Sequence, residues 1–229
     1  MTFWSAVRYF QAVTPVRIYF RAAMIGIVLL EVELAIQGGR SDAALVSLLI
    51  VQMFAVSTGF RGHASRGHYD PLLTRLPRRT LALAHWTASA APGVVAWIAI
   101  AVVEGVEARS LRILALDPSA VCALLLVSAV AWSVSAPLGP LTGGSLWLMA
   151  SVAAVVNGGV MKLVGLFHAG VATPTPVRLA IAIALPPFMV GAPWSAVEIA
   201  CLAGAAAFSV LLASAYLSRA SFPLREEAS

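Results

Sequence analysis

Charged residues are scarce in this chain. Asp, Glu, Lys and Arg together make up 11% of its 229 residues, against about a quarter in typical soluble domains. So little charge cannot cover the surface of a soluble fold, whereas 60% of the residues are hydrophobic and the mean hydropathy is +0.91. We therefore expect a membrane protein whose apolar runs cross a hydrocarbon core of about 30 Å as helices.

Cysteine is scarce too, which argues against a disulfide framework and against thiolate metal sites. Cys122 and Cys201 lie in separate apolar runs without metal-type spacing, and we interpret them as small buried hydrophobes. His63, His68 and His85 have no cysteine or carboxylate cluster around them, so we expect no metal site.

Signatures of several enzyme classes are also missing. The phosphate-binding pattern G-x-x-x-x-G-K-[ST] does not occur, so we expect no ATP site in this chain. Gly143, Gly144 and Ser145 lack the G-x-S-x-G pattern of a serine nucleophile, which disfavours a hydrolase. We expect a protein that is not an enzyme and that binds no cofactor itself.

The apolar runs predict an all-α membrane protein with a single transmembrane domain over residues 1–229. Residues 1–16 have the pattern of an amphipathic interfacial helix, with Phe3, Trp4, Val7 and Phe10 on one side. The prolines within 168–194 predict a re-entrant or interfacial hairpin, because its apolar run is too short to span. The six predicted spans are Ile18 to Gln37, Ala43 to Phe60, Leu81 to Val103, Ser119 to Ser135, one beginning near Ser145, and Ala196 to Leu217.

The basic residues indicate the orientation. The N-terminal segment, the loop 61–80 and the tail 218–229 together carry Arg8, Arg17, Arg21, Arg61, Arg66, Arg75, Arg78, Arg79, Arg219 and Arg225, which is ten of the fifteen. Cytoplasmic segments of membrane proteins are enriched in Lys and Arg, so these segments and both termini are predicted to be cytoplasmic. Topology thus explains the net charge of +5 without a nucleic-acid partner.

The densest group of charges and prolines is the stretch GHYDPLLTRLPRR, Gly67 to Arg79. Asp70 followed by Pro71 has the form of a helix start, and Pro77 ends the segment after about six residues. Leu72, Leu73 and Leu76 would form one apolar edge of this helix, surrounded by arginines. One interpretation is an ordinary basic loop that anchors the topology. The other is an apolar ridge that fits a groove on a partner protein.

The chain resembles ABC-2-type permeases. The resemblance covers essentially the whole length: an interfacial N-terminal helix, six spans, the pattern G-x-x-D-P-L-L between the second and third spans, and a proline-rich segment before the last. Within GHYDPLLTRLPRRTLALAHW, the glycine, acidic residue, leucine pair, proline and arginine are similar to that family's coupling segment. The chain lacks the sizeable outer domain of larger members.

This resemblance implies a permease subunit in the bacterial inner membrane that works as a dimer, with itself or with a homologous permease. It would bind a separate cytoplasmic ATPase, which holds ATP and Mg²⁺, and would export an unidentified, amphipathic or lipid-like substrate. The residues that it implies for docking the ATPase, with their neighbours, are Gly67, Tyr69, Asp70, Pro71, Leu72, Leu73, Arg75, Leu76 and Arg78.

Polar residues inside the spans are candidates for a translocation path. Glu31 and Glu33 point about 200° apart on a helix, so they do not share one helical face. Three interpretations are open for them: they line a path, they pair with Lys162, or they lie in the headgroup zone. Gln52 and Asn157 are interpreted as interhelical hydrogen-bonding groups or as substrate ligands.

Two alternatives remain open on the sequence. One is a haem-exporter-B-like subunit of cytochrome c maturation, which has a similar length and number of spans. The other is a membrane scaffold without transport activity, which would bind a cytoplasmic partner through the same helix but would need no gated polar path.

Overall fold

The computed structural model describes residues 2–13, 17–36, 42–64, 76–108, 116–138, 174–190 and 193–219. Within these ranges the chain is helical and contains no strand, which confirms the all-α prediction there. The elements are α1 (Phe3–Val13), α2 (Arg17–Ile36), α3 (Asp42–Ala64), α4 (Arg78–Ala108), α5 (Pro118–Leu138), α8 (Thr175–Ala184), the 3-10 helix η3 (Pro186–Met189) and α9 (Ala196–Arg219).

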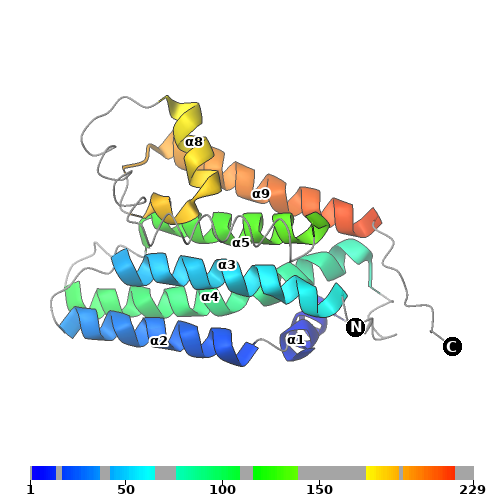
Figure 1. Ribbon diagram of the computed structural model, residues 1–229, viewed down its shortest axis with the longest axis horizontal. Helices are drawn as coiled ribbons and strands as arrows, with labels where there is room; N and C mark the ends of the chain where they lie inside the picture. Colours follow the sequence, from blue (N-terminus) through cyan, green and yellow to red (C-terminus); the bar gives the residue numbers. More distant parts are fainter. Residues whose placement is uncertain are drawn as a thin grey trace.

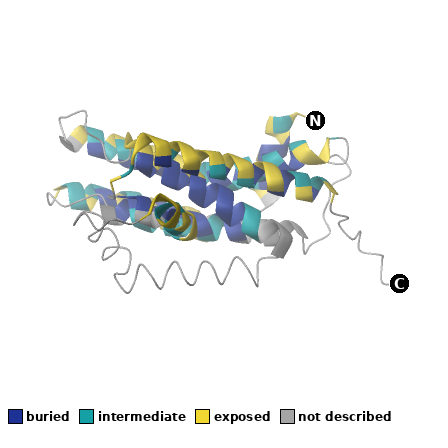
Figure 2. Ribbon diagram, turned by 90° about the horizontal axis from the view of Figure 1, so that it is seen from above, coloured by how far each residue is buried: buried dark blue, intermediate teal, exposed yellow. Residues whose placement is uncertain are grey.

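Five long helices lie lengthwise beside one another (Figure 1). Helix α4 packs against α1, α2 and α3, while α5 joins α3 to α9. Figure 2 shows the buried residues facing inward between these helices and the exposed ones along their outer sides. Helix α3 supplies much of the core, since Leu45, Leu48, Leu49 and Met53 recur at helical spacing and are fully buried.

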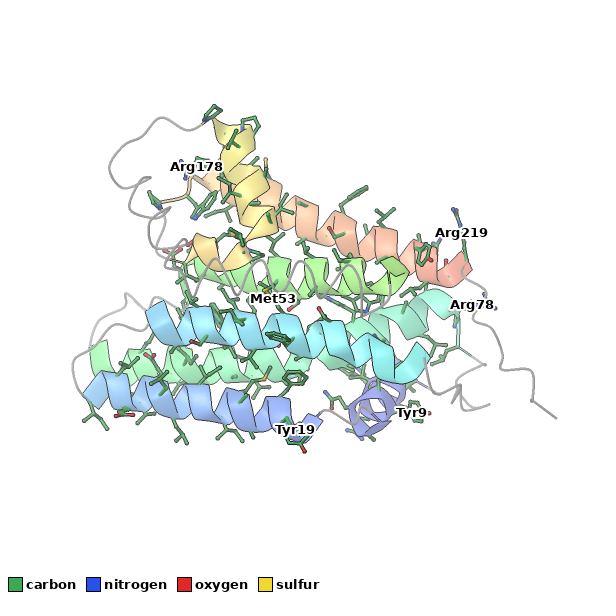
Figure 3. The ribbon with its side chains drawn as sticks, viewed as in Figure 1. Tyr9, Tyr19, Met53, Arg78, Arg178 and Arg219 are labelled. Atoms are coloured by element: carbon green, nitrogen blue, oxygen red, sulfur yellow. The ribbon has the colours of Figure 1, made fainter. Side chains whose placement is uncertain are left out.

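The bundle has two distinct ends. Helix α3 ends and α4 begins at one of them, which we call the loop end, and α1 and the last turn of α9 lie there too (Figure 1). Helices α8 and η3 lie at the opposite end. Figure 3 places Arg78 and Arg219 at the loop end and Arg178 at the opposite end. Helix α1 and the last turn of α9 thus lie at the same end as the predicted docking loop.

Two described helices are long and apolar enough to cross a membrane, over 78–106 and Ala196–Arg219. Only 33% and 28% of their most apolar windows are buried, so neither resembles the core helix of a soluble protein. Their outward residues include Val95 and Ile98 of α4 and Phe208 and Leu211 of α9, each more than half exposed. These helices match the third and sixth predicted spans.

The other predicted spans stand differently. Helices α2, α3 and α5 occupy the positions of the first, second and fourth spans, and their membrane crossing stays a prediction. The fifth span lies outside the described residues. In the hairpin region, ten-residue α8 is followed by η3; at about 1.5 Å per residue α8 is too short to cross a bilayer.

Two predicted boundaries were wrong. The loop predicted at 61–80 is shorter, because α3 continues to Ala64 and α4 already begins at Arg78. The third predicted span ends at Val103, whereas α4 continues to Ala108. The charged residue that follows Val103, Glu104, lies inside the helix and is only 5% exposed.

Candidate functional site

The predicted docking segment lies mostly outside the described residues, so its helical form stays a prediction. The residues concerned are Gly67, Tyr69, Asp70, Pro71, Leu72, Leu73 and Arg75. Of its other members, Leu76 is partly buried and Arg78 is exposed at the start of α4. The described part of the site is therefore the base to which the segment is attached.

That base is an apolar cluster between α1 and the first turns of α4. Its buried members, the α1–α4 cluster, are Ala6, Val7, Phe10, Leu81, Ala84 and Ala88. Leu76 packs against this cluster and so contacts the body of the protein, at the end of the segment whose apolar edge it was predicted to share. Trp4, predicted on the same face of α1 as Val7, is 66% exposed instead.

His85 connects this base to the interior of the bundle. Trp132 of α5 donates a hydrogen bond from Nε1 to His85 Nδ1 at 3.1 Å, and the His85 ring lies edge-on to Phe10 with centroids 5.2 Å apart. Because Nδ1 accepts this hydrogen bond, the neutral ring carries its hydrogen on Nε2. One residue of α4 thus contacts α1 on one side and α5 on the other.

Replacing Trp132 by phenylalanine tests this connection. In a double-mutant cycle with His85→Leu, we expect a coupling free energy of about 1 kcal/mol, the value of one buried hydrogen bond. The measurement is equilibrium unfolding in mixed detergent micelles. Trp86→Phe is the control, because Trp86 donates to the Ser128 carbonyl and not to His85, so its coupling with His85→Leu should be smaller than that of Trp132→Phe. Fully additive costs for Trp132→Phe would contradict the assignment.

Gln52 binds three helices together. Its Nε2 donates to the Ala90 carbonyl of α4 at 3.2 Å and to Ser128 Oγ of α5 at 3.1 Å, and the side chain is fully buried. A Cβ on Gly93 would lie 2.0 Å from Gln52 Oε1, so only glycine leaves room for the amide there. Both amide protons are thus used between helices, which favours the interhelical interpretation of Gln52.

Of the four remaining path candidates, two lie in the part of the chain that the structure describes and two lie outside it. Asn157 and Lys162 lie outside the described residues, so the predicted pairing with Lys162 stays a prediction. Glu31 is 1% exposed, whereas Glu33 is exposed. The two glutamates therefore face different surroundings, as their spacing predicts. Whether either residue lines a path stays a prediction.

At the opposite end, a cluster of polar side chains stabilises the start of α9. Arg178 of α8 pairs through Nε with Glu198 Oε1 at 3.3 Å, hydrogen-bonds the Pro193 carbonyl, and lies 4.9 Å from the Trp194 ring centroid. Glu198 Oε2 accepts the Ser195 N–H at 2.9 Å, and Ser195 Oγ accepts the Glu198 N–H at 3.3 Å. This reciprocal arrangement is a capping box.

These interactions were not predicted, although the sequence contains a signal for them. Ser195 and Glu198 form the pattern S-x-x-E before an apolar run, which predicts a capped helix start. Arg178, the partner of Glu198, could not have been predicted, because twenty positions separate the two residues and only the placement of α8 brings them together.

The start of α5 has the same residues as the helix start predicted in the docking segment. Asp117 precedes Pro118, the first residue of α5, and Asp117 Oδ1 accepts the Ser119 N–H at 2.8 Å. This is an aspartate cap with proline in the first turn. Asp70 and Pro71 form the same dipeptide, so the chain itself offers an example of the structure predicted there.

An open apolar groove lies on the side of the bundle, between α2 and α4. Its volume is about 550 Å³, and Gln11 of α1 borders it together with residues of both longer helices. As for metals, no group of three His, Cys, Asp or Glu side chains within the described ranges is placed to hold an ion.

Comparisons of the chain with protein-family models, with curated proteins and with solved structures found no match.

Proposed function

We propose that the chain is the membrane-spanning subunit of an ABC-2-type exporter. In this proposal it lies in the bacterial inner membrane with both termini cytoplasmic, works as a dimer, and exports an amphipathic or lipid-like substrate. ATP and Mg²⁺ belong to a separate ATPase, and the loop of residues 65–77 between α3 and α4 docks it.

The observation that carries the proposal is the sequence of this loop together with its attachment. The loop has the charge, leucine and proline pattern of a coupling segment. It leads into α4, a helix of 31 residues, or about 46 Å, which extends from the loop end to the opposite end. Force applied at the loop therefore acts directly on one long helix.

The contacts of α4 support transmission of that force. Near its start, α4 holds α1 through the α1–α4 cluster and contacts α5 through His85 and Trp132. Further along α4, the Ala90 carbonyl accepts a hydrogen bond from Gln52 of α3, and Gly93 leaves room for the Gln52 amide. A displacement of α4 consequently reaches α1, α3 and α5 through packed side chains, as a coupling element requires.

Co-purification tests the proposal. In the double variant Leu72→Asp and Leu73→Asp, we expect a nucleotide-binding ATPase to be lost from the tagged protein purified from native membranes. Two buried charges would replace the apolar anchors of the interface, and removing one such anchor already weakens binding on the order of 30-fold. Mass spectrometry of the bound soluble proteins measures the loss.

The control is the double variant Leu72→Met and Leu73→Met, which keeps apolar side chains of similar volume and should retain the ATPase. The size-exclusion profile of each variant checks its folding. If the unmodified protein brings down no ATPase, the exporter proposal fails. Retention of the ATPase by the aspartate variant would instead show that it docks elsewhere.

A further inference from the structure

The groove between α2 and α4 combines an apolar channel with a polar end. From α2 it is lined by Arg21, Met24, Ile25, Val28 and Leu29; from α4 by Ala91, Pro92, Val95, Ala96 and Ala99; and from α1 by Gln11. The polar side chains Arg21 and Gln11 come from the first part of α2 and the last part of α1. All the other lining side chains are apolar.

The shape of the groove suits a narrow, elongated ligand. Along α2, the distance from Arg21 to Leu29 corresponds to about 12 Å of helix. Alanines at 91, 96 and 99 of α4 take up little space and form the floor of the groove. Its walls are Ile25 and Leu29 of α2 and Val95 of α4, which are 61%, 62% and 67% exposed. A volume of about 550 Å³ lies within the range of about 300–1,000 Å³ in which proteins hold small molecules.

The charge of the groove favours an anion at its polar end. Arg21 is exposed and makes no ion pair or hydrogen bond to the residues that the structure describes. None of the described residues that line the groove is acidic. A guanidinium group binds phosphate through parallel N–H donors, and the Gln11 amide adds a donor and an acceptor beside it.

We propose that this groove binds one anionic phospholipid, with its phosphate on Arg21 and Gln11 and an acyl chain along α2 and α4. The apolar channel alone cannot select a ligand inside a bilayer, because lipid tails are as apolar as leucine side chains. Selectivity for an anionic headgroup therefore comes from Arg21. This site involves neither the docking loop nor an ATPase, and of the proposed function it requires only that α2 and α4 lie in a membrane.

A second copy of the chain is a poorer occupant. In a two-fold contact the same face meets itself, so Arg21 would be covered by a groove whose described lining residues include no acid. Covering an arginine without a partner is unfavourable. A phosphate removes that cost and leaves the walls in contact with an acyl chain.

Native mass spectrometry with added phosphatidylglycerol or phosphatidylcholine of identical acyl chains tests the proposal. For Arg21→Gln, we expect the apparent Kd for phosphatidylglycerol to rise about tenfold or more, since a hydrogen-bonded charge pair with the phosphate is lost. The Kd for phosphatidylcholine, whose phosphate charge is offset by its choline cation, should rise less. Arg219→Gln, at an exposed arginine of the same end, is the control and should leave both affinities unchanged. Equal losses in the two variants would overturn the proposal.

Filling the groove provides a second test. Ala99→Phe should remove the bound phosphatidylglycerol, whereas Ala207→Phe on the exposed side of α9 should not. A Val95→Cys variant in a Cys201→Ala background distinguishes a second copy. Efficient cross-linking between chains that phosphatidylglycerol does not reduce would show a protein interface and overturn the lipid assignment.

Discussion

Replacing Gly93 by alanine should destabilise the protein by about 2–4 kcal/mol. The new Cβ would lie 2.0 Å from Gln52 Oε1 and 2.4 Å from Cδ, and Gln52 is fully buried and hydrogen-bonded to two other helices. The amide must leave its position, so two hydrogen bonds of about 1 kcal/mol each are weakened and the packing is strained by about 1–3 kcal/mol. Equilibrium unfolding in mixed micelles measures the loss.

The chain offers controls for this prediction. Gly26→Ala and Gly204→Ala place a methyl group where nothing lies within 4 Å, so each should stabilise its helix by about 0.5–1 kcal/mol. In a Gln52→Ala background the clash disappears, and Gly93→Ala should lose most of its cost. If its cost stays the same in that background, the contact with Gln52 is not its cause.

Replacing Glu198 by alanine should cost about 2–4 kcal/mol. The carboxylate caps α9 through Oε2 and pairs with Arg178 through Oε1, and the two side chains are only 7% and 20% exposed. Losing the cap costs about 1 kcal/mol. The rest comes from removing the carboxylate that pairs with the Arg178 cation, whose contact with water is reduced.

Two smaller changes separate these contributions. Ser195→Ala removes the serine half of the capping box and should cost about 1 kcal/mol. Glu198→Gln keeps an oxygen that accepts the Ser195 N–H but loses the charge, so its cost should be intermediate and should fall at high salt. If Glu198→Ala costs no more than Ser195→Ala, the ion pair contributes nothing to stability.

Much of the helical pattern could be predicted from local features of the sequence. Apolar runs placed α2, α3, α4, α5 and α9 to within a few residues at most ends. The least accurate boundary was the end of α4, because the apolar run stops at Val103, just before the charged Glu104. Burial of a carboxylate depends on its neighbours in space, which a local pattern does not contain.

The candidate docking segment was predictable only as a sequence pattern. Its aspartate and proline match the cap observed at Asp117 and Pro118, and that comparison uses local chemistry alone. The contact of Leu76 with the α1–α4 cluster could not be predicted, since it requires α1 to lie against α4. The sequence alone does not decide whether an apolar residue in a basic loop packs against a partner protein or against its own bundle. The arrangement of the helices decides it.

Composition and local spacing alone therefore specify a helical, apolar chain with capped helix starts and a basic loop. The partners of its polar groups depend on the packing of the helices. Trp132 meets His85 across 47 positions, and Gln52 meets Ser128 across 76. Such pairs form only where two helices approach at a particular rotation and depth, and Gly93 sets that approach by leaving space for Gln52. A helix cap joins groups that are only a few residues apart, so it can be predicted from the local sequence. These pairs form only in the assembled bundle.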